Sequence, residues 1–506
     1  MVVRASGLLL GIAGLPGNYG IGKLGKEARN FVDFLKKSGQ RYWQILPLSP
    51  TGYGDSPYQS CSVRAGNPYF IDFETLEQEG LLKPADYQNT QFGDNPRYIH
   101  YGMLYQTVAP TLKKAYERFK PDAGYEEFLR KNADWVQDYA LYTAVKEENS
   151  GKPWYEWENS LKMARPEALA AAKERLADKI GYQLFVQYEF FKQWHELKLY
   201  ANRNGVEIIG DMPIYCAYDS VEAWLNPELF EFDQNKRPLS VAGCPPDDYA
   251  KDGQLWGNPI YNWNAMRDNG YNWWINRIAF ETDIYDVLRI DHFRGFAGYF
   301  SIPYGSQTAA AGKWRKGPGM SLFNSTNYWL GPKRIIAEDL GFVTDDVRTL
   351  LKEAGYPGMK VLQFAFDPNA KNAYLPCNFE SKDCAVYTST HDSSTASGWA
   401  EKLGGDTLKF CMSYMNITDK KDIPDGLLRA AWSSIADTAI AQPQDFLGLG
   451  DETRINVPGT LGLNWRWRLS REDLSFAFSD KLLSLTKTYN RIVTGPVPAL
   501  QKAQGR

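Results

Sequence analysis

The residues of this sequence that could perform chemistry are concentrated in three short segments, each placing a carboxylate where an apolar run ends. The segments are RIDHFR (289–294), IAEDLG (336–341) and THD (390–392). In a parallel α/β barrel the carboxyl ends of all strands meet at one rim, so Asp291, Glu338 and Asp392 are expected to lie together there. Carboxyl groups in pairs are what glycosidic-bond chemistry requires.

Two of these acids are predicted to differ in protonation. Arg289 lies two residues before Asp291 and shares its face of the strand, which points inward if the alternate residues face the helices. A guanidinium lowers the pKa of a neighbouring carboxyl and keeps it ionised, as a nucleophile needs. Glu338 is followed by Asp339, and a neighbouring carboxylate in a dry site would raise its pKa, which suits a general acid.

A structural role is the alternative for each acid taken singly. Arg289 and Asp291 alone would equally well form a buried ion pair, and one acid at the rim would serve as the N-cap of the next helix. Asp211, which closes another apolar run, and Asp392, beside His391, bring the number of rim acids to four. Four acids at four strand ends favour a shared catalytic site.

Short β-type runs recur along the chain and alternate with helical patterns. We expect seven strands, at 42–48, 68–73, 206–211, 287–291, 334–338, 359–366 and 385–390. Helical patterns such as 26–38 and 344–354 lie between them. This alternation predicts a parallel sheet, and the acids at the strand ends favour a closed (β/α)8 TIM barrel over an open sheet.

The spacing of the strands predicts one catalytic barrel domain over residues 1–506 with three insertions. A largely helical segment is expected at about 76–204, an aromatic, loop-rich segment at 213–285 and a loop at 296–333. Long loops after barrel strands lie on the catalytic face and shape the substrate site. No C-terminal β-domain is expected.

Composition narrows the class of protein further. The 506 residues carry a net charge of −3 with a pI near 6.0, which argues against a nucleic-acid binder. The apolar start at 7–15 is too short and glycine-rich for a secretory signal, and no stretch approaches the roughly 20 apolar residues of a membrane span. Six cysteines without a C-x-x-C pair indicate reduced thiols in a cytoplasmic protein. The 16 Trp, 31 Tyr and 25 Phe fit a large core or stacking against sugar rings.

Two glycine patterns near the start suggest nucleotide binding but fail on context. The segment 20–25 matches G-x-G-x-x-G, yet no strand precedes it and no acid lies about twenty residues further on. The segment 17–23 nearly matches a phosphate-binding loop, but Leu24 stands where a Ser or Thr should hold Mg²⁺. The four histidines show no i, i+4 spacing. We therefore expect neither a metal nor an organic cofactor.

These segments resemble glycoside hydrolase family 77 of the α-amylase superfamily, a family of 4-α-glucanotransferases. Similar motifs run through nearly the whole chain: RASG (4–7), LPG (15–17), GIG (20–22), GDSPYQ (54–59), GNP (66–68), GDMPIY (210–215), PPD (245–247), QLWGNP (254–259), RIDHFRG (289–295), NVPGT (456–460) and NW (464–465). RIDHFRG is the most specific, because it separates this family from ordinary amylases. The resemblance implies a barrel enzyme that transfers segments of maltooligosaccharides or amylose.

The resemblance also implies roles for the rim residues. Asp291 resembles the nucleophile that forms a glucosyl-enzyme, and Glu338 the acid that protonates the leaving oxygen and then activates the acceptor. Asp392 resembles the third acid, which holds the 2- and 3-hydroxyls of the sugar. Arg289 and His391 resemble partners of the donor sugar and the nucleophile.

Substrate contacts are implied at further positions. The resemblance implies that the substrate is contacted by Ser56, Tyr58, Asp211, Gln254, Trp256, His292, Phe364 and Asn464. Tyr58 resembles the residue that stacks on the sugar being cleaved. Tyr53 and Tyr101 match residues that would stack a glucan in a remoter groove.

One departure from the family pattern concerns the rim. The family usually continues His-Asp-Asn-Asp, whereas Ser393 and Ser394 follow Asp392 here. The third acid is kept, so the chemistry is expected to survive, but the preferred donor and acceptor lengths stay open, as does the oligomeric state.

Two other functions are compatible with part of this pattern. One is a retaining α-1,4-glucan hydrolase with little transfer; RIDHFRG and an aromatic loop at 245–259 that would exclude water favour transfer instead. The other is a non-catalytic glucan-binding protein, which predicts the loss of at least one of the three acids. A retaining mechanism would place its two catalytic carboxyls roughly 5–5.5 Å apart.

Overall fold

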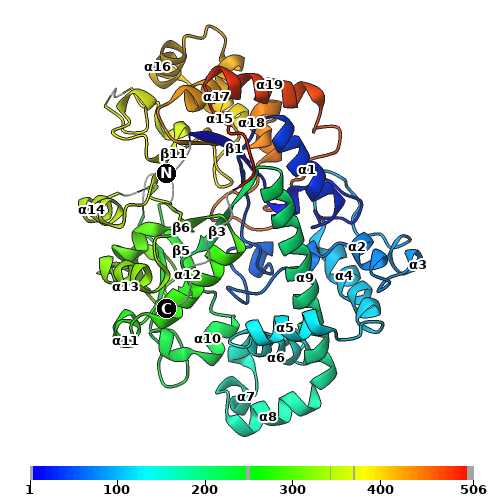
Figure 1. Cartoon of the computed structure of the whole chain (residues 1–506). Helices are drawn as coiled ribbons and strands as arrows, with labels where there is room; N and C mark the ends of the chain where they lie inside the picture. Colours follow the sequence, from blue (N-terminus) through cyan, green and yellow to red (C-terminus); the bar gives the residue numbers. More distant parts are fainter. Residues whose placement is uncertain (1–3, 247–250, 342, 369–370, 498–506) are drawn as a thin grey trace.

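Eight parallel strands close into a barrel at the centre of the protein, in a computed structural model that describes residues 4–246, 251–341, 343–368 and 371–497. The strands are β1 (Ala5–Leu9), β2 (Tyr42–Gln44), β3 (Glu207–Pro213), β6 (Val287–Asp291), β9 (Ile335–Ala337), β10 (Gly358–Val361), β11 (Cys384–Tyr387) and β12 (Thr438–Ala441). Each pairs with the next barrel strand along the chain, and β12 pairs with β1 to close the ring. The predicted (β/α)8 barrel is confirmed (Figure 1).

Six of the seven predicted strands belong to the barrel, and the segment 68–73 does not. It forms a 3-10 turn, Pro68–Phe70, and leads into helix α2 (Phe73–Gln78). The side chains of Asn67 and Asp72 each accept a hydrogen bond from a backbone amide at these helical starts. Local capping therefore overrides the β-type composition of this run.

The prediction lacks two barrel strands, β1 and β12. Their sequences, ASGLL and TAIA, are short: β1 has no β-branched or aromatic residue, and the two β-branched residues of β12 alternate with alanines, so the strand signal is weak. At Gly7 in β1, a Cβ atom would lie 2.2 Å from the carbonyl oxygen of Tyr42 in the neighbouring strand. Close packing of β1 against β2 therefore requires glycine at position 7, and glycine weakens the sequence signal for a strand.

Side chains alternate between the inside and the outside of the barrel along β6. Val287 belongs to the apolar cluster that fills the barrel, whereas Leu288 and Ile290 belong to the outer core. The two-residue period of a strand therefore places Arg289 and Asp291 on the inner face, as predicted.

Helices surround the barrel and fill its long connections (Figure 1). Between β2 and β3 the chain forms α2, α3 (Pro84–Tyr87), α4 (Tyr101–Tyr116), α5 (Ala123–Lys131), α6 (Val136–Glu148), α7 (Asn159–Lys162), α8 (Pro166–Arg175) and α9 (Ala177–Arg203). The other helices are α1 (Lys26–Lys37), α10 (Val221–Leu225), α11 (Trp263–Asp268), α12 (Asn272–Ile284), α13 (Met320–Leu330), α14 (Asp345–Ala354), α15 (Ala396–Lys402), α16 (Gly405–Met415), α17 (Ile423–Ser433), α18 (Pro443–Leu447) and α19 (Phe476–Thr488). None of the described helices has the length and apolarity needed to cross a membrane.

A four-stranded antiparallel sheet forms within segments that were expected to be loops. Its order is β5-β4-β7-β8, with β4 (Ser240–Cys244), β5 (Gln254–Pro259), β7 (Gly298–Pro303) and β8 (Lys313–Lys316). All four residues of β8, KWRK, are exposed, so this strand lacks the alternation of apolar and polar residues that reveals a strand. The sheet matters for the site because β5 carries Gln254 and Trp256.

Glu207, at the start of β3, allows a test of how much a buried ion pair at this end of the barrel contributes to stability. Its carboxylate binds Arg41 at 2.5 Å and Arg334 at 2.6 Å, and the Glu207 and Arg41 side chains are 5% and 7% exposed. Glu207→Ala would leave the Arg41 guanidinium buried without a carboxylate. We expect the free energy of unfolding in urea to fall by about 3–5 kcal/mol. Glu127→Ala, which removes only exposed pairs with Arg130 and Lys131, should cost less than about 1 kcal/mol; equal losses would contradict the expectation.

Candidate active site

Four acids lie at the carboxyl ends of four barrel strands. Asp211 lies in β3, Asp291 ends β6, Glu338 directly follows β9, and Asp392 lies in the turn after β11. The side chains of Asp291 and Asp392 are 27% and 45% exposed, whereas that of Asp211 is fully buried. A substrate can therefore reach Asp291 and Asp392, while Asp211 supports the site from behind.

A buried guanidinium connects two of these acids. Arg289 binds Asp211 at 2.5 Å through Nη1 and Asp291 at 3.1 Å through Nη2. Arg289 and Asp211 occupy matching positions on the paired strands β6 and β3, so the strand register brings them together. The arginine side chain is only 4% exposed and that of Asp211 is fully buried, which keeps this ion pair out of water.

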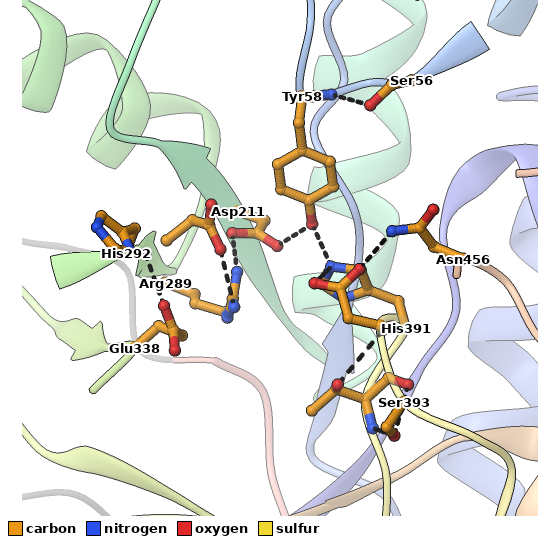
Figure 2. A network of polar contacts seen from close by, with 12 residues as sticks. Ser56, Tyr58, Asp211, Arg289, His292, Glu338, His391, Ser393 and Asn456 are labelled. Carbon is orange, nitrogen blue, oxygen red and sulfur yellow. Dashed lines mark hydrogen bonds and ion pairs between the residues drawn. The ribbon is translucent and has the colours of Figure 1, made fainter. Parts of the chain in front are cut away.

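Tyr58 connects the two sides of the site (Figure 2). Its hydroxyl donates a hydrogen bond to Asp211 Oδ2 at 2.7 Å, and the same oxygen lies 2.9 Å from His391 Nε2. His391 Nε2 lies 3.3 Å from Asp392 Oδ2. The Tyr58 and His391 rings are stacked with their centroids 5.3 Å apart. Tyr58 thus links the β3–β6 ion pairs to the turn after β11.

The charge on Asp291 results from opposing effects. Burial raises the pKa of this carboxyl to about 6, although Arg289 lowers it, and the charge of Asp211 raises it further. Arg289 lowers the pKa of Asp291, as predicted, but burial raises this pKa by more. Asp291 still remains mostly ionised at neutral pH, the state that a nucleophile needs.

Glu338 has a raised pKa, as predicted, but from a different neighbour. Burial raises the pKa of its carboxyl to about 7, and the negative charge of Asp291 adds to this. Asp339, the expected neighbour, instead accepts a hydrogen bond from the Met359 amide at 2.7 Å. A carboxyl that titrates near neutral pH can both donate and accept a proton.

His292 holds Glu338 through its backbone. Its amide donates to Glu338 Oε2 at 2.7 Å, and the Leu340 amide donates to Oε1 at 2.9 Å. His292 adopts a left-handed conformation with φ of 53°, which directs its N–H toward Glu338 (Figure 2). Its ring packs edge-on against Trp256 at 4.8 Å, and burial lowers the ring's pKa to about 3. His292 is therefore neutral near physiological pH.

The third acid, Asp392, remains ionised. Burial alone would raise its pKa, but His391 and a hydrogen bond from Asn456 hold it well below its usual range. Burial likewise disfavours the charged form of His391, yet Asp392 raises the histidine's pKa overall. Asp392 is therefore a permanent hydrogen-bond acceptor at the rim.

Three of the expected contact residues lie beside these groups. Trp256 donates its indole N–H to Gln254 Oε1 at 3.0 Å, which fixes both side chains on β5. Ser56 Oγ accepts the amide hydrogen of Tyr58 at 3.2 Å (Figure 2). Their positions are compatible with the contacts implied by the resemblance.

Other expected residues have structural roles or lie outside the described residues. Asn464 accepts from the Val457 amide at 3.0 Å and donates to the Thr460 carbonyl at 2.9 Å, so it organises its own loop. Tyr101 is only 6% exposed and donates its hydroxyl to the Trp465 carbonyl; its stacking against a glucan stays a prediction.

Phe364 is 45% exposed and packs edge-on against Tyr374. The side chain of Tyr53 is outside the described part of the structure. Across the described ranges, no cluster of three or more His, Cys, Asp or Glu side chains is placed to hold a metal ion. Cys61, Cys216, Cys377, Cys384 and Cys411 are free thiols.

The two serines that depart from the family pattern turn back toward the protein. Ser393 Oγ accepts from the Thr390 amide at 2.9 Å, and Ser394 Oγ donates to Asp451 Oδ2 at 3.0 Å. Both hydroxyls are therefore engaged with the chain behind Asp392.

Sequence reasoning did not select Asn456 as a site residue. Its side chain donates to Asp392 Oδ1 at 2.7 Å across 64 positions of the chain. The NVPGT motif was a usable signal, but the contact itself depends on tertiary structure.

A (β/α)8 rim with an accessible ionised aspartate and a glutamate that titrates near pH 7 defines an enzyme that acts on glycosidic bonds. Residues 10–474 match the family described as 4-alpha-glucanotransferase, glycoside hydrolase family 77, and the chain belongs to that family.

Similar proteins agree with this assignment over nearly their whole length. A 4-alpha-glucanotransferase of Clostridium butyricum is 46% identical over 95% of this chain and 99% of its own, and one of Streptococcus pneumoniae serotype 4 is 46% identical over 97% and 98%. The solved structure of an amylomaltase from Streptococcus agalactiae in complex with acarbose superimposes with a TM-score of 0.95, at 42% identity, over 97% of this chain and 100% of that chain.

The two raised pKa values predict a narrow pH optimum. Activity should fall as the pH drops below about 6, because Asp291 becomes protonated, and as it rises above about 7, because Glu338 loses its proton. A pH profile of kcat/KM on a maltooligosaccharide should therefore be bell-shaped with its maximum between these values. A maximum above pH 8 would contradict this assignment of acid and nucleophile.

Proposed function

We propose that this 4-α-glucanotransferase cleaves an α-1,4 bond and passes the non-reducing fragment to the 4-hydroxyl of another glucan by double displacement. Asp291 attacks the anomeric carbon and forms a glucosyl-enzyme, while Glu338 gives its proton to the leaving oxygen. Glu338 then takes a proton from the acceptor hydroxyl, whose oxygen displaces Asp291. Two inversions give net retention.

The opposite protonation of two neighbouring carboxyls carries this proposal. Asp291 is accessible and binds Arg289 at 3.1 Å, so its charged form is stabilised. The pKa of Glu338 is raised to about 7, because burial and the charge of Asp291 act in the same direction. Loss of the negative charge on Asp291 in the glucosyl-enzyme would lower the pKa of Glu338 and prepare it to act as the base.

Asp392 is suited to bind the sugar rather than to transfer a proton. Its low pKa keeps it ionised through the pH range in which the other two acids titrate. An ionised carboxylate accepts hydrogen bonds through both oxygens, so it can bind adjacent sugar hydroxyls and stabilise developing positive charge.

Maltooligosaccharides and amylose-type α-1,4-glucans are the proposed donors and acceptors. The similarity to an amylomaltase that binds acarbose supports a sugar at this rim. The β5 segment with Trp256 lies against His292 and would help to exclude water, which favours transfer over hydrolysis. Residues 247–250 of the expected covering loop lie outside the described residues. A cytoplasmic location remains a prediction from cysteine usage.

Incubation with maltotriose tests the proposed function directly. We expect a ladder of longer maltooligosaccharides together with free glucose, separated by chromatography, because a sugar acceptor replaces water at the glucosyl-enzyme. Maltose and glucose alone, with rising reducing ends, would instead identify a hydrolase. No product from maltotriose or amylose would favour a non-catalytic glucan-binding protein.

Substitution of the two catalytic carboxyls should abolish transfer without unfolding the protein. Glu338→Gln should lower kcat by about 10²–10⁴-fold through loss of acid–base catalysis, and Asp291→Asn should cost at least as much because no glucosyl-enzyme can form. Asp339→Asn is the matched control: it removes the adjacent carboxylate but keeps an oxygen to accept from the Met359 amide. Near-normal transfer by either catalytic variant would refute the roles assigned here.

A further inference from the structure

The segment 454–456 lies against the turn that carries His391 and Asp392. The Asn456 amide donates to the His391 carbonyl at 3.0 Å. Arg454 donates to the Asp392 carbonyl at 2.6 Å through Nη2 and to the Asn456 carbonyl at 2.8 Å through Nε. The bonds to the carbonyls of His391 and Asp392 fix the two segments relative to each other, and the bond from Arg454 to the Asn456 carbonyl holds the segment 454–456 itself.

The Asn456 side chain extends this contact to the carboxylate itself (Figure 2). Its Nδ2 donates to Asp392 Oδ1 at 2.7 Å, while Asp392 Oδ2 faces His391 Nε2 at 3.3 Å. Each carboxylate oxygen thus has its own donor, and the two donors come from different segments. Because two donors restrain the plane of the carboxylate, its outward face is oriented before any substrate binds.

A second set of bonds supports Arg454 from behind. Its Nη1 lies 3.4 Å from Ser394 Oγ, which donates to Asp451 at 3.0 Å. Lys402 forms an ion pair with Asp451 and donates to Ser394 Oγ at 3.1 Å. Ser394, one of the two residues that depart from the family pattern, therefore contributes to the support of Asp392 in this chain.

We propose that Asn456 is a positioning residue that holds the Asp392 carboxylate in the orientation in which it binds the hydroxyls of the donor sugar. This inference rests on the proposed function. Asn456 acts through Asp392 and is not assigned a contact with the reacting atoms. An amide suits this role because it has no titratable proton and remains a donor at every pH.

The first expected effect is on turnover. Asn456→Ala should lower kcat/KM for maltotriose by about 10–100-fold, the effect of losing one hydrogen bond to a charged group. The loss should lie mainly in kcat, because a misoriented carboxylate still contacts the sugar but stabilises the transition state poorly.

Asn456→Asp gives a sharper test because it changes one amide to a carboxylate of the same shape. Near pH 7.5 two carboxylates would face each other and repel, so activity should fall further than in Asn456→Ala. On acidification one proton shared between them restores a hydrogen bond. The activity of Asn456→Asp relative to wild type should rise by about tenfold or more between about pH 7.5 and 5.5, whereas the Asn456→Ala ratio should stay constant.

Charged and titratable groups around Asp392 are present in wild type and variants alike. They are Tyr58, Arg289, Asp291, His391 and Arg454. Their titration, including protonation of Asp291 in acid, affects wild type and variants alike. Dividing the activity of a variant by that of wild type at each pH therefore largely removes this effect.

Asn202→Asp is the matched control at the other end of the barrel. Asn202 Nδ2 donates to Asp286 Oδ2 at 2.8 Å, so this substitution creates the same pair of carboxylates next to the start of β6. It should lower the thermal unfolding temperature, while its activity ratio stays near 1 across the same pH range.

The outcomes separate the inference from the function on which it rests. If wild type makes no ladder from maltotriose or amylose, the proposed function fails. If wild type is active but the Asn456→Asp ratio does not change with pH, or changes as in Asn202→Asp, the inference is overturned. Should Asn456→Asp fail to fold, Asn456→Ala decides: a loss mainly in kcat supports positioning, and one mainly in KM or none at all refutes it.

Discussion

The buried guanidinium of Arg289 is the interaction on which the rest of the site depends. It binds Asp211 and Asp291 together inside the barrel, where it is 4% exposed. Without this cation, two carboxylates would share a low-dielectric space at the end of adjacent strands, and one would take up a proton. The two-residue period of β6 points Arg289 and Asp291 inward, so the strand itself supplies the cation beside the nucleophile.

Loss of solvation by the surrounding protein raises the pKa of each of the three acids, and their neighbouring groups make the three pKa values different. Asp392 has an imidazole and an amide as donors, and it stays charged. Glu338 has two backbone amides but also faces Asp291, and its pKa rises to about 7. Three side chains of the same chemical type thereby acquire the distinct states that a double displacement requires.

The sequence was sufficient for the barrel class and the rim acids, because apolar runs ending in an acid are a local pattern. It was insufficient where tertiary structure decides. The strands β1 and β12 consist largely of small residues, and all of β8 is exposed, so none shows the usual strand pattern. Burial outweighing Arg289 at Asp291, and the contact of Asn456 with Asp392, both depend on neighbours that no local window contains.

The backbone around Glu338 has a further consequence. Its amide donates to the Ile290 carbonyl at 3.0 Å, and its own carbonyl accepts from the Phe293 amide at 3.0 Å, so nucleophile and acid are joined across one pair of adjacent strands. Their separation is therefore set by strand register and is independent of the length of the segment between them. Evolution can enlarge or replace β7 and β8, which lie between β6 and β9 in the chain, and with them the choice of substrate, while the stereochemical course of the reaction is inherited unchanged.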